Sequence, residues 1–295
     1  MHVTISIINY NYGRYLREAI NSALVQKAKG VTTDILVIDD GSTDDSDQII
    51  ASYSHISNFS CSKTENRGFA FALTRAVREA KGDFVLLMDA DDFFADHKLS
   101  TIVPFLQQGF LYVADTSTYV NERSEKIKGE AWGSTSTIAV NRSAALPILP
   151  VENELSFFLL YKIGKGISLP DHCTNYRFHH HSMTSRNIPG KQNTYLSTVA
   201  LNLSDSVLNL LKQGNKLPWE VTPGRVRRAA YEFRSQSHYN KLEAALETKC
   251  TRSSYKHFLL MVYWQLRSQQ IITIFHLKML VKTIIQKPSF DQIVK

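Results

Sequence analysis

Three acidic residues stand together in the segment Asp89-Ala90-Asp91-Asp92, directly after the apolar run 84–88. If their carboxylates face one small volume they repel one another, and a divalent cation offsets that repulsion. Mg²⁺ and Mn²⁺ prefer oxygen ligands and keep open positions for phosphate oxygens. Because alternate side chains of a strand point the same way, Asp89 and Asp91 can reach one ion. The pattern predicts a divalent-metal site, and a solvated acidic turn is the alternative.

Two further polar clusters follow apolar runs. Asp39-Asp40-Gly41-Ser42 comes after 34–38, and residues 9–13 (NYNYG) come after 4–8. A carboxylate at Asp39 or Asp40 can accept hydrogen bonds from the N–H of a nucleotide base or from a ribose hydroxyl. A simple turn is the competing interpretation, because Asp-Gly pairs are common in turns.

The elements that must position these clusters alternate along the chain. The apolar runs predict strands at 4–9, 34–38 and 84–88, and helical spacing predicts helices at 14–27, 44–53 and 68–81. Ser42 or Thr43 is expected to cap the second of these helices. Such alternation is typical of an α/β fold with a mainly parallel sheet flanked by helices, in which ligands bind beyond the carboxyl ends of the strands. All three polar clusters fall at those ends.

Four segments in this order resemble the family 2 glycosyltransferases: residues 5–16 (ISIINYNYGRYL), 37–44 (VIDDGSTD), 66–68 (NRG) and 82–92 (GDFVLLMDADD). The resemblance extends over about residues 1–186. It implies a GT-A nucleotide-diphospho-sugar transferase fold and inverting, metal-assisted transfer of a sugar from a nucleotide-diphosphate sugar, commonly a UDP-sugar. The acceptor expected is a hydroxyl of a glycan or of a lipid-linked molecule in surface polysaccharide or glycan synthesis.

The resemblance also implies individual roles on the donor side. Tyr10 matches the aromatic residue that packs on the nucleotide base, and Asp40 matches the carboxylate that binds the base, with Asp39 beside it. Arg67 lies near the position of a basic residue that meets the nucleotide. Ile8 and Ala90, which adjoin these motifs, complete the predicted donor-binding set.

On the metal side, Asp91 matches the carboxylate that holds metal and diphosphate, Asp89 contacts the donor sugar or ribose, and Asp92 supports the metal. The cofactor implied is Mn²⁺ or Mg²⁺. His179, after Tyr-Arg in the closing segment of the family, is predicted to complete the metal or diphosphate site. The loop Trp132-Gly133-Ser134 resembles the one that faces the acceptor and the donor diphosphate.

The catalytic base is left open between two residues. Inverting transfer needs a carboxylate to take the proton of the acceptor hydroxyl, and the family usually supplies it from a Glu-Asp pair. This chain has Glu152-Asn153-Glu154 in the corresponding region, so Glu152 is the first candidate and Glu154 the second. If Asn153 holds the position of the base, the chain is a catalytically impaired nucleotide-sugar-binding or scaffolding domain. Nucleotidyl transfer is disfavoured, because residues 9–13 do not resemble a glycine-rich phosphate loop.

Composition agrees with a globular protein: 43% of the 295 residues are hydrophobic and 21% are charged. The three cysteines suggest neither a disulfide framework nor a CxxC metal site. The N-terminus does not read as a signal peptide, and no window reaches the apolar length of a membrane span. We therefore expect a cytoplasmic protein.

Charge separates the C-terminal third from the rest. Residues 190–295 hold 16 Lys/Arg and 6 Asp/Glu, whereas the whole chain has a net charge of +7. The texture there is helical, with segments at 193–213, 225–247 and 254–286, and we expect a domain boundary between 1–190 and 191–295. A solvated basic face, a protein contact and peripheral binding to the inner face of an anionic membrane remain open. No fold motif supports nucleic-acid binding.

Overall fold

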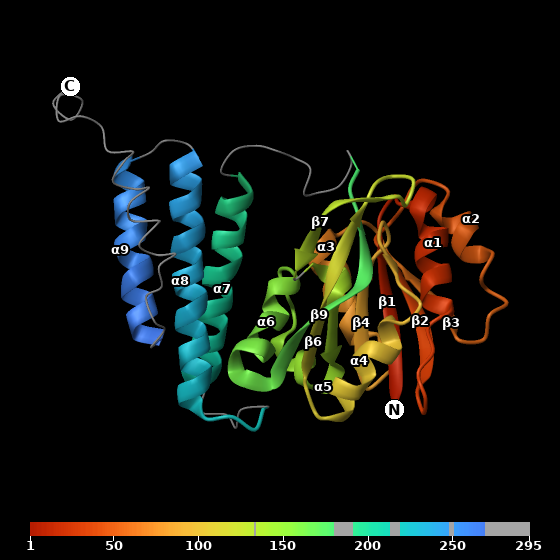
Figure 1. Ribbon diagram of the computed structural model, residues 1–295, viewed down its shortest axis with the longest axis horizontal. Coiled ribbons are helices and arrows are strands. Elements are labelled where there is room, and N and C mark those ends of the chain that lie inside the picture. Colours follow the sequence, from red (N-terminus) through yellow and green to blue (C-terminus); the bar gives the residue numbers. More distant parts are fainter. Residues whose placement is uncertain (133, 180–190, 213–218, 248–250, 269–295) are drawn as a thin grey trace. The chain divides into compact units, whose positions relative to one another are not determined.

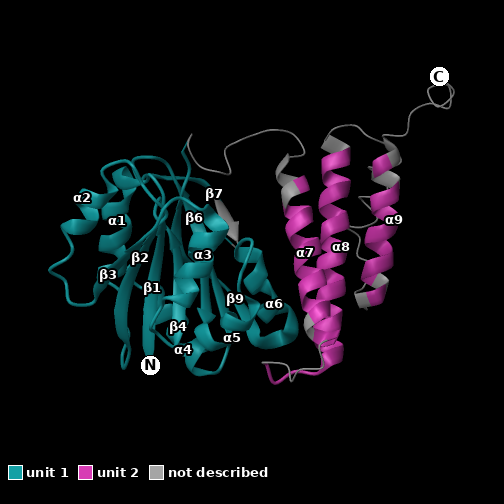
Figure 2. Cartoon of the chain, turned by 180° about the vertical axis from the view of Figure 1, so that it is seen from behind, with its two compact units in different colours: residues 1–182 teal, residues 183–295 magenta. Residues whose placement is uncertain are grey.

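The computed structural model describes residues 1–132, 134–179, 191–212, 219–247 and 251–268 (Figure 1). The chain divides into two compact units, Met1–Ser182 and Met183–Lys295 (Figure 2). The boundary expected at residue 190 lies outside the described residues.

One mixed sheet organises the first unit. Its strands, within the described residues, are β1 (His2–Asn9), β2 (Thr32–Asp39), β3 (Phe59–Lys63), β4 (Phe84–Asp89), β5 (Phe93–Phe94), β6 (Tyr112–Val120), β7 (Lys126–Trp132), β8 (Ile138–Asn141) and β9 (Gly166–Arg177). They lie in the order β3-β2-β1-β4-β8-β6-β9-β5, and β7 pairs with β6. Strands β3, β2, β1 and β4 are mutually parallel, and β6 and β9 are parallel to each other. Strands β5, β7 and β8 are antiparallel to their partners, so the sheet is mainly parallel, as the sequence predicts.

The continuous apolar runs become strands that are buried on both faces. The helices of the first unit, within the described residues, are α1 (Gly13–Leu24), α2 (Ser46–Ala51), α3 (Phe69–Arg78), α4 (Lys98–Gln107), α5 (Arg142–Ala145) and α6 (Phe158–Leu160). Its short helical turns are η1 (Thr135–Thr137), η2 (Leu146–Ile148), η3 (Glu154–Phe157) and η4 (Tyr161–Lys165). Ile5 and Ile7 of β1 belong to a core cluster with Leu16 and Ile20 of α1. Ser6, on the opposite face, donates to the Ala76 carbonyl oxygen of α3 at 2.9 Å. Helices therefore cover both faces and leave the strand ends open.

The start of α2 differs from the sequence-based expectation. Asp45, rather than Ser42 or Thr43, occupies the N-cap position, and its side chain makes no capping hydrogen bond. The Ser42 hydroxyl is occupied elsewhere, because it accepts hydrogen bonds from the Asn9 side chain and from the Asn11 N–H. The prediction was wrong because the loop after β2 is tied to β1 before the helix begins.

The second unit is helical in its described residues. It contains α7 (Lys191–Lys212), α8 (Pro223–Glu247) and α9 (Thr251–Ser268); residues 269–286 of the third predicted helix lie outside the described part. A small core of Leu242, Phe258 and Met261 joins α8 to α9. Arg234 of α8 pairs with Asp205 of α7, and its guanidinium carbon lies 4.9 Å from the Trp264 ring centroid. Among the residues described, none of the helices has the length and apolar character needed to cross a bilayer.

Candidate functional site

The register of the sheet brings the three polar clusters to one edge. Asn9 pairs with Asp39 across β1 and β2, and Ile8 pairs with Asp89 across β1 and β4. Because these strands are parallel, their carboxyl ends meet side by side. The main chain continues the arrangement, since the Ala90 N–H donates to the Ile8 carbonyl oxygen at 2.9 Å. Both residues are buried, so they contribute to this edge through their main chains and through packing.

The carboxylates after β4 are crowded. Asp89, Asp91 and Asp92 each offer an oxygen, and these oxygens lie within 4.8 Å of one another. Burial first, and then the charge of Asp91, raise the pKa values of Asp89 and Asp92 well above the ordinary range. Grouped hard oxygen donors suit Mg²⁺ or Mn²⁺, and a cation there would offset the repulsion that raises these pKa values. The residues present therefore fit the metal that the sequence predicts.

His179 lies against the same cluster. Its Nε2 is 2.9 Å from Asp91 Oδ2, and the imidazole ring packs against the rings of Tyr12 and Tyr15 at centroid distances of 5.5 and 5.1 Å. Its Nδ1 is buried and has no hydrogen-bond partner among the described residues. The histidine thus contacts the predicted metal ligand Asp91 directly.

Two residues that the sequence analysis did not single out hold the acid cluster in place. Arg177 donates its main-chain N–H to Asp92 Oδ1 at 2.8 Å and its Nε to the Asp91 carbonyl oxygen at 2.8 Å. Ser136, in η1, donates its hydroxyl to Asp92 Oδ2 at 2.6 Å. Both oxygens of Asp92 therefore already accept from the protein. The position of Arg177 between Tyr176 and the predicted ligand His179 could have pointed to this role from the sequence. Nothing in the sequence around Ser136 points to it.

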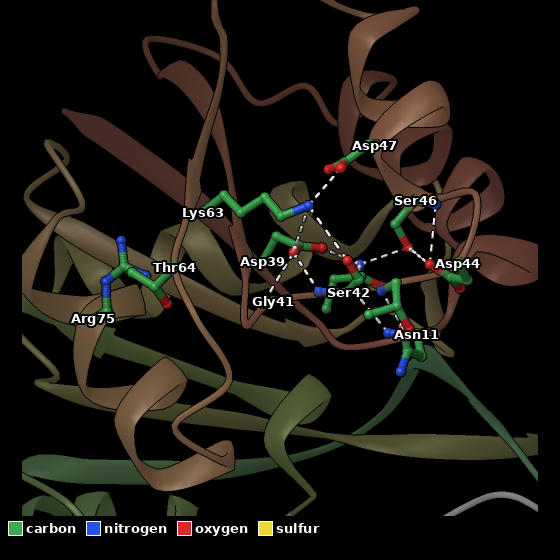
Figure 3. A network of polar contacts seen from close by, with 12 residues as sticks. Asn11, Asp39, Gly41, Ser42, Asp44, Ser46, Asp47, Lys63, Thr64 and Arg75 are labelled. Carbon is green, nitrogen blue, oxygen red and sulfur yellow. Dashed lines mark hydrogen bonds and ion pairs between the residues drawn. The ribbon is translucent and has the colours of Figure 1, made fainter.

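The end of β2 is a different environment (Figure 3). Asp39 is fully buried; its Oδ1 accepts the N–H groups of Gly41 (3.1 Å) and Ser42 (2.8 Å), and its Oδ2 accepts the Asn9 side-chain amide (2.7 Å). Lys63 Nζ lies 4.0 Å from Asp39 Oδ1. A carboxylate enclosed in this way orders the loop. In this structure the Asp39 carboxylate orders the loop, and its predicted contact with the donor stays a prediction.

Asp40 faces the start of α3. Its oxygens accept the main-chain N–H groups of Arg67 (3.0 Å) and Gly68 (2.7 Å), and its side chain is almost fully buried. Each carboxylate oxygen has a further lone pair. The carbon of the Arg67 guanidinium lies over the Phe71 ring, 3.9 Å from its centroid. Tyr10 is 46% exposed, which leaves its ring accessible at this edge.

The two base candidates differ in their surroundings. Glu152 is exposed, whereas Glu154 is half-buried at the start of η3. Burial raises the pKa of Glu154, and the Glu154 charge in turn contributes to the raised pKa of Asp89. Asn153 between them is buried and accepts the Leu155 N–H on its side-chain oxygen, so it caps η3. Of the two acids, Glu154 is therefore the one whose charge acts on Asp89 in the acid cluster.

The predicted acceptor loop is described only in part. Gly133 and the side chain of Trp132 lie outside the described residues, and the main chain of Trp132 pairs with Thr116 of β6. The Ser134 carbonyl oxygen accepts the Thr137 N–H at 2.9 Å and starts the turn η1. Within the described residues the Ser134 hydroxyl is buried and has no partner. This loop leads directly into Ser136 and so adjoins the acid cluster.

A sequence model of glycosyl transferase family 2 matches residues 4–181 of the chain. An uncharacterized glycosyltransferase of Nostoc sp. is 28% identical over 212 residues, which is 61% of this chain and 65% of that protein. The poly(ribitol-phosphate) beta-N-acetylglucosaminyltransferase TarS of Staphylococcus aureus is 29% identical over 110 residues, 37% of this chain and 19% of TarS. The matched segment of another relative, from Mycoplasma genitalium, spans 55% of that protein, so the chain covers less than two thirds of these relatives.

Among solved structures, S. aureus TarS 1–349 in complex with UDP-GlcNAc superposes with a TM-score of 0.61 at 16% identity, over 92% of this chain and 93% of that one. At this identity the likeness concerns the fold. It confirms the predicted GT-A fold, a mainly parallel sheet flanked by helices and followed by C-terminal helices.

Proposed function

The chain belongs to glycosyl transferase family 2, and we propose that it transfers a sugar from a UDP-sugar to a hydroxyl of a glycan or lipid-linked acceptor. The observation that carries the proposal is the convergence of Asp40 and Asp91 on one edge of the sheet, at the ends of the adjacent strand pairs β2–β1 and β1–β4. The N-acetylglucosaminyltransferase TarS, whose fold is similar and which has been solved with UDP-GlcNAc, supports a UDP-sugar, of hexosyl or hexosaminyl type, and an acceptor of the cell-surface polymer class.

On the donor side, we assign the nucleotide to Tyr10 and Asp40. The exposed Tyr10 ring offers a face for stacking on the base, and a stacked base is worth about 1–3 kcal/mol in other proteins. Asp40 retains lone pairs for the N–H of the base. Asp39 holds the loop that presents Asp40, and Arg67 supplies its main-chain N–H to the same carboxylate.

On the phosphate side, Asp91 is the principal residue that would hold Mn²⁺ or Mg²⁺, with Asp89 and Asp92 beside it and His179 bonded to Asp91. Such an ion supplies positive charge to the departing diphosphate. Asp92 orients the cluster through its two protein donors, and Asp89 stands where a donor ribose or sugar hydroxyl would bind.

For the transfer step we propose Glu154 as the base in preference to Glu152. The carboxylate takes the proton of the acceptor hydroxyl, the acceptor oxygen forms a bond to the anomeric carbon, and the bond from that carbon to the nucleotide diphosphate breaks with its electron pair on the leaving oxygen. Attack opposite the leaving group inverts the anomeric configuration. A base with a raised pKa also matches the demand of the step near neutral pH.

A measurement of UDP-sugar hydrolysis, which uses water as acceptor, tests this assignment. Glu154→Gln should lower the rate by about 10²-fold or more, and Glu152→Gln should leave it close to wild type. The reverse result would transfer the role to Glu152.

A non-catalytic nucleotide-sugar-binding or scaffolding domain is the second candidate, because Asn153 stands in the Glu-Asp region. UDP-sugar hydrolysis by the wild type no faster than the uncatalysed rate, together with intact UDP binding, would favour that candidate.

We also propose that the second unit binds the inner, cytoplasmic face of an anionic membrane. On α9, Lys256, Leu259, Tyr263 and Arg267 follow helical spacing and are exposed, with Leu259 at 64% and Tyr263 at 49%. An apolar and aromatic stripe between cations suits a lipid interface. Sedimentation with phosphatidylglycerol vesicles should fall for Lys256→Glu/Arg267→Glu, and equal binding to phosphatidylcholine vesicles would contradict the proposal.

A further inference from the structure

Lys98, the first residue of α4, is a fully buried lysine in the first unit. Its Nζ donates to Asp115 Oδ1 at 2.7 Å, to the Ser136 carbonyl oxygen at 2.6 Å and to Thr174 Oγ1 at 2.8 Å. An ammonium group has three hydrogens, so every one of them has an acceptor. Lysine is rarely buried this completely, which calls for a reason specific to the site.

The acceptors come from three elements that are distant in sequence. Asp115 lies on β6, Thr174 on β9 and Ser136 in the turn η1. Thr174 Oγ1 closes the network by donating to Asp115 Oδ2 at 2.8 Å. A buried ion pair seldom adds net stability over apolar residues of similar size, because both charges lose their hydration. The network therefore specifies an arrangement of these elements more than it strengthens the fold.

The arrangement leads directly to the acid cluster. Ser136, whose carbonyl oxygen Lys98 holds, donates its hydroxyl to Asp92 Oδ2 at 2.6 Å and accepts the Asp89 N–H at 3.0 Å. One residue thus joins the buried ammonium to the side chain of one clustered acid and to the main chain of another. Without Lys98 the Ser136 carbonyl would lose the shorter of its two buried contacts, since the Thr174 hydroxyl lies 3.1 Å away, and the ammonium that ties η1 to the buried Asp115 carboxylate would be gone.

We propose that Lys98 is a positioning residue of the metal site: it fixes η1 so that Ser136 holds Asp92 and the main chain of Asp89 in the geometry that binds the ion. The inference rests on the proposed function, because it presupposes a cation at Asp89, Asp91 and Asp92. Partners that orient metal ligands typically change metal affinity by about 10- to 100-fold when they are removed. Within the described residues the Lys98 ammonium makes no hydrogen bond to Asp89, Asp91 or Asp92, so it would act through Ser136.

The test is a Mn²⁺ titration followed by electron paramagnetic resonance, with UDP present, at a temperature where each variant is folded by circular dichroism. Lys98→Met keeps an unbranched side chain and removes all three donors. We expect its Mn²⁺ dissociation constant to rise about 10-fold or more. Transfer or hydrolysis should fall at limiting Mn²⁺ and recover at saturating Mn²⁺, whereas UDP binding without metal should stay unchanged.

A matched control is Arg75→Met. Arg75 is also a buried cation that joins distant elements, since it donates to Ser62, Thr64 and Glu79 (Figure 3 draws Arg75 and Thr64). Within the described residues, none of the hydrogen bonds or ion pairs of Arg75 reaches Asp89, Asp91 or Asp92. This variant should lose thermal stability and keep the wild-type Mn²⁺ affinity, which separates positioning from a general loss of structure.

If Lys98→Met does not fold, Ser136→Ala takes its place, because it removes only the hydroxyl that reaches Asp92; it should weaken Mn²⁺ binding in the same direction. If Lys98→Met folds and binds Mn²⁺ with wild-type affinity, the inference is overturned and the proposed function stays intact. If Lys98→Met does not fold, wild-type Mn²⁺ affinity of Ser136→Ala has the same meaning. A wild-type protein that binds no Mn²⁺ overturns the proposed metal site together with the inference.

Discussion

The two acidic strand ends, after β2 and after β4, balance their charges in opposite ways. Asp39 and Asp40 accept four main-chain N–H groups and the Asn9 amide, so the protein itself satisfies them. The acids after β4 crowd one another, and two of them have raised pKa values because of burial and mutual repulsion. The same residue type at neighbouring positions of one sheet edge therefore lies in two environments. Main-chain and amide donors hold Asp39 and Asp40, of which Asp40 is the proposed base-binding residue, whereas the crowded carboxylates are the proposed metal ligands.

The largest expected effect is on activity at the crowded end. Asp91→Asn removes the charge that we assign to the metal, and kcat/KM should fall about 10²- to 10³-fold. The free energy of unfolding in EDTA should not decrease, because the substitution also removes a source of repulsion. Kinetics and urea unfolding of the same preparation check both statements. Near-wild-type activity would contradict the metal-binding role that distinguishes the acids after β4 from those after β2.

Metal should stabilise the protein only through the acid cluster after β4. Ligand binding to the native state alone adds about 2.7 kcal/mol at a concentration of 100 times the dissociation constant. We expect Mn²⁺ to raise the melting temperature of the wild type and of Asp39→Asn, and to leave that of Asp91→Asn unchanged. Thermal shift with and without EDTA measures this, and an equal rise in all three proteins would indicate nonspecific binding.

A substitution at the satisfied end should act on stability. In the wild type the Asn9 side-chain amide donates to Asp39 Oδ2. In Asp39→Asn, an NH₂ group in place of that oxygen would face the Asn9 NH₂ group, so that two donors meet without an acceptor. The loss of a charge-assisted bond and the unpaired donor should cost about 2 kcal/mol of unfolding free energy. Urea unfolding checks the value. An unchanged midpoint would show that Asp39 does not order the loop.

The smallest effect is expected at the exposed face of the nucleotide site. Tyr10→Ala should weaken UDP binding by about 10-fold, because only one stacking contact is lost. Tyr10→Phe is the matched control and should keep the affinity, since it preserves the ring. Calorimetry distinguishes them, and equal weakening by both variants would assign the hydroxyl, rather than stacking, to the contact.

Much of the first unit could be predicted from the sequence, because its strands are continuous apolar runs and its acids follow them directly. The runs at 34–38 and 84–88 lie within β2 and β4, and both acidic clusters meet at one edge. These features can be read from local sequence, because each acidic cluster directly follows the apolar run that forms its strand.

Other features depend on contacts between distant segments, and the sequence could not predict them. Lys98 resembles any lysine at the start of a helix, and only the tertiary structure surrounds it with Asp115, Ser136 and Thr174. The enclosed state of Asp39 depends on the Asn9 side chain from another strand. The preference for Glu154 over Glu152 likewise comes from burial, which two acids in one short segment do not reveal.

The most direct test of the account is the coupling between UDP and Mn²⁺ measured by calorimetry. If Asp40 binds the base and Asp91 would hold a cation that offsets the charge of the diphosphate, Mn²⁺ must tighten UDP binding, and UDP must tighten Mn²⁺ binding by the same factor. Uridine, which lacks phosphates, should bind equally with and without the metal. Asp91→Asn should abolish the coupling and still bind uridine. Equal UDP affinity with and without Mn²⁺ in the wild type would contradict the account.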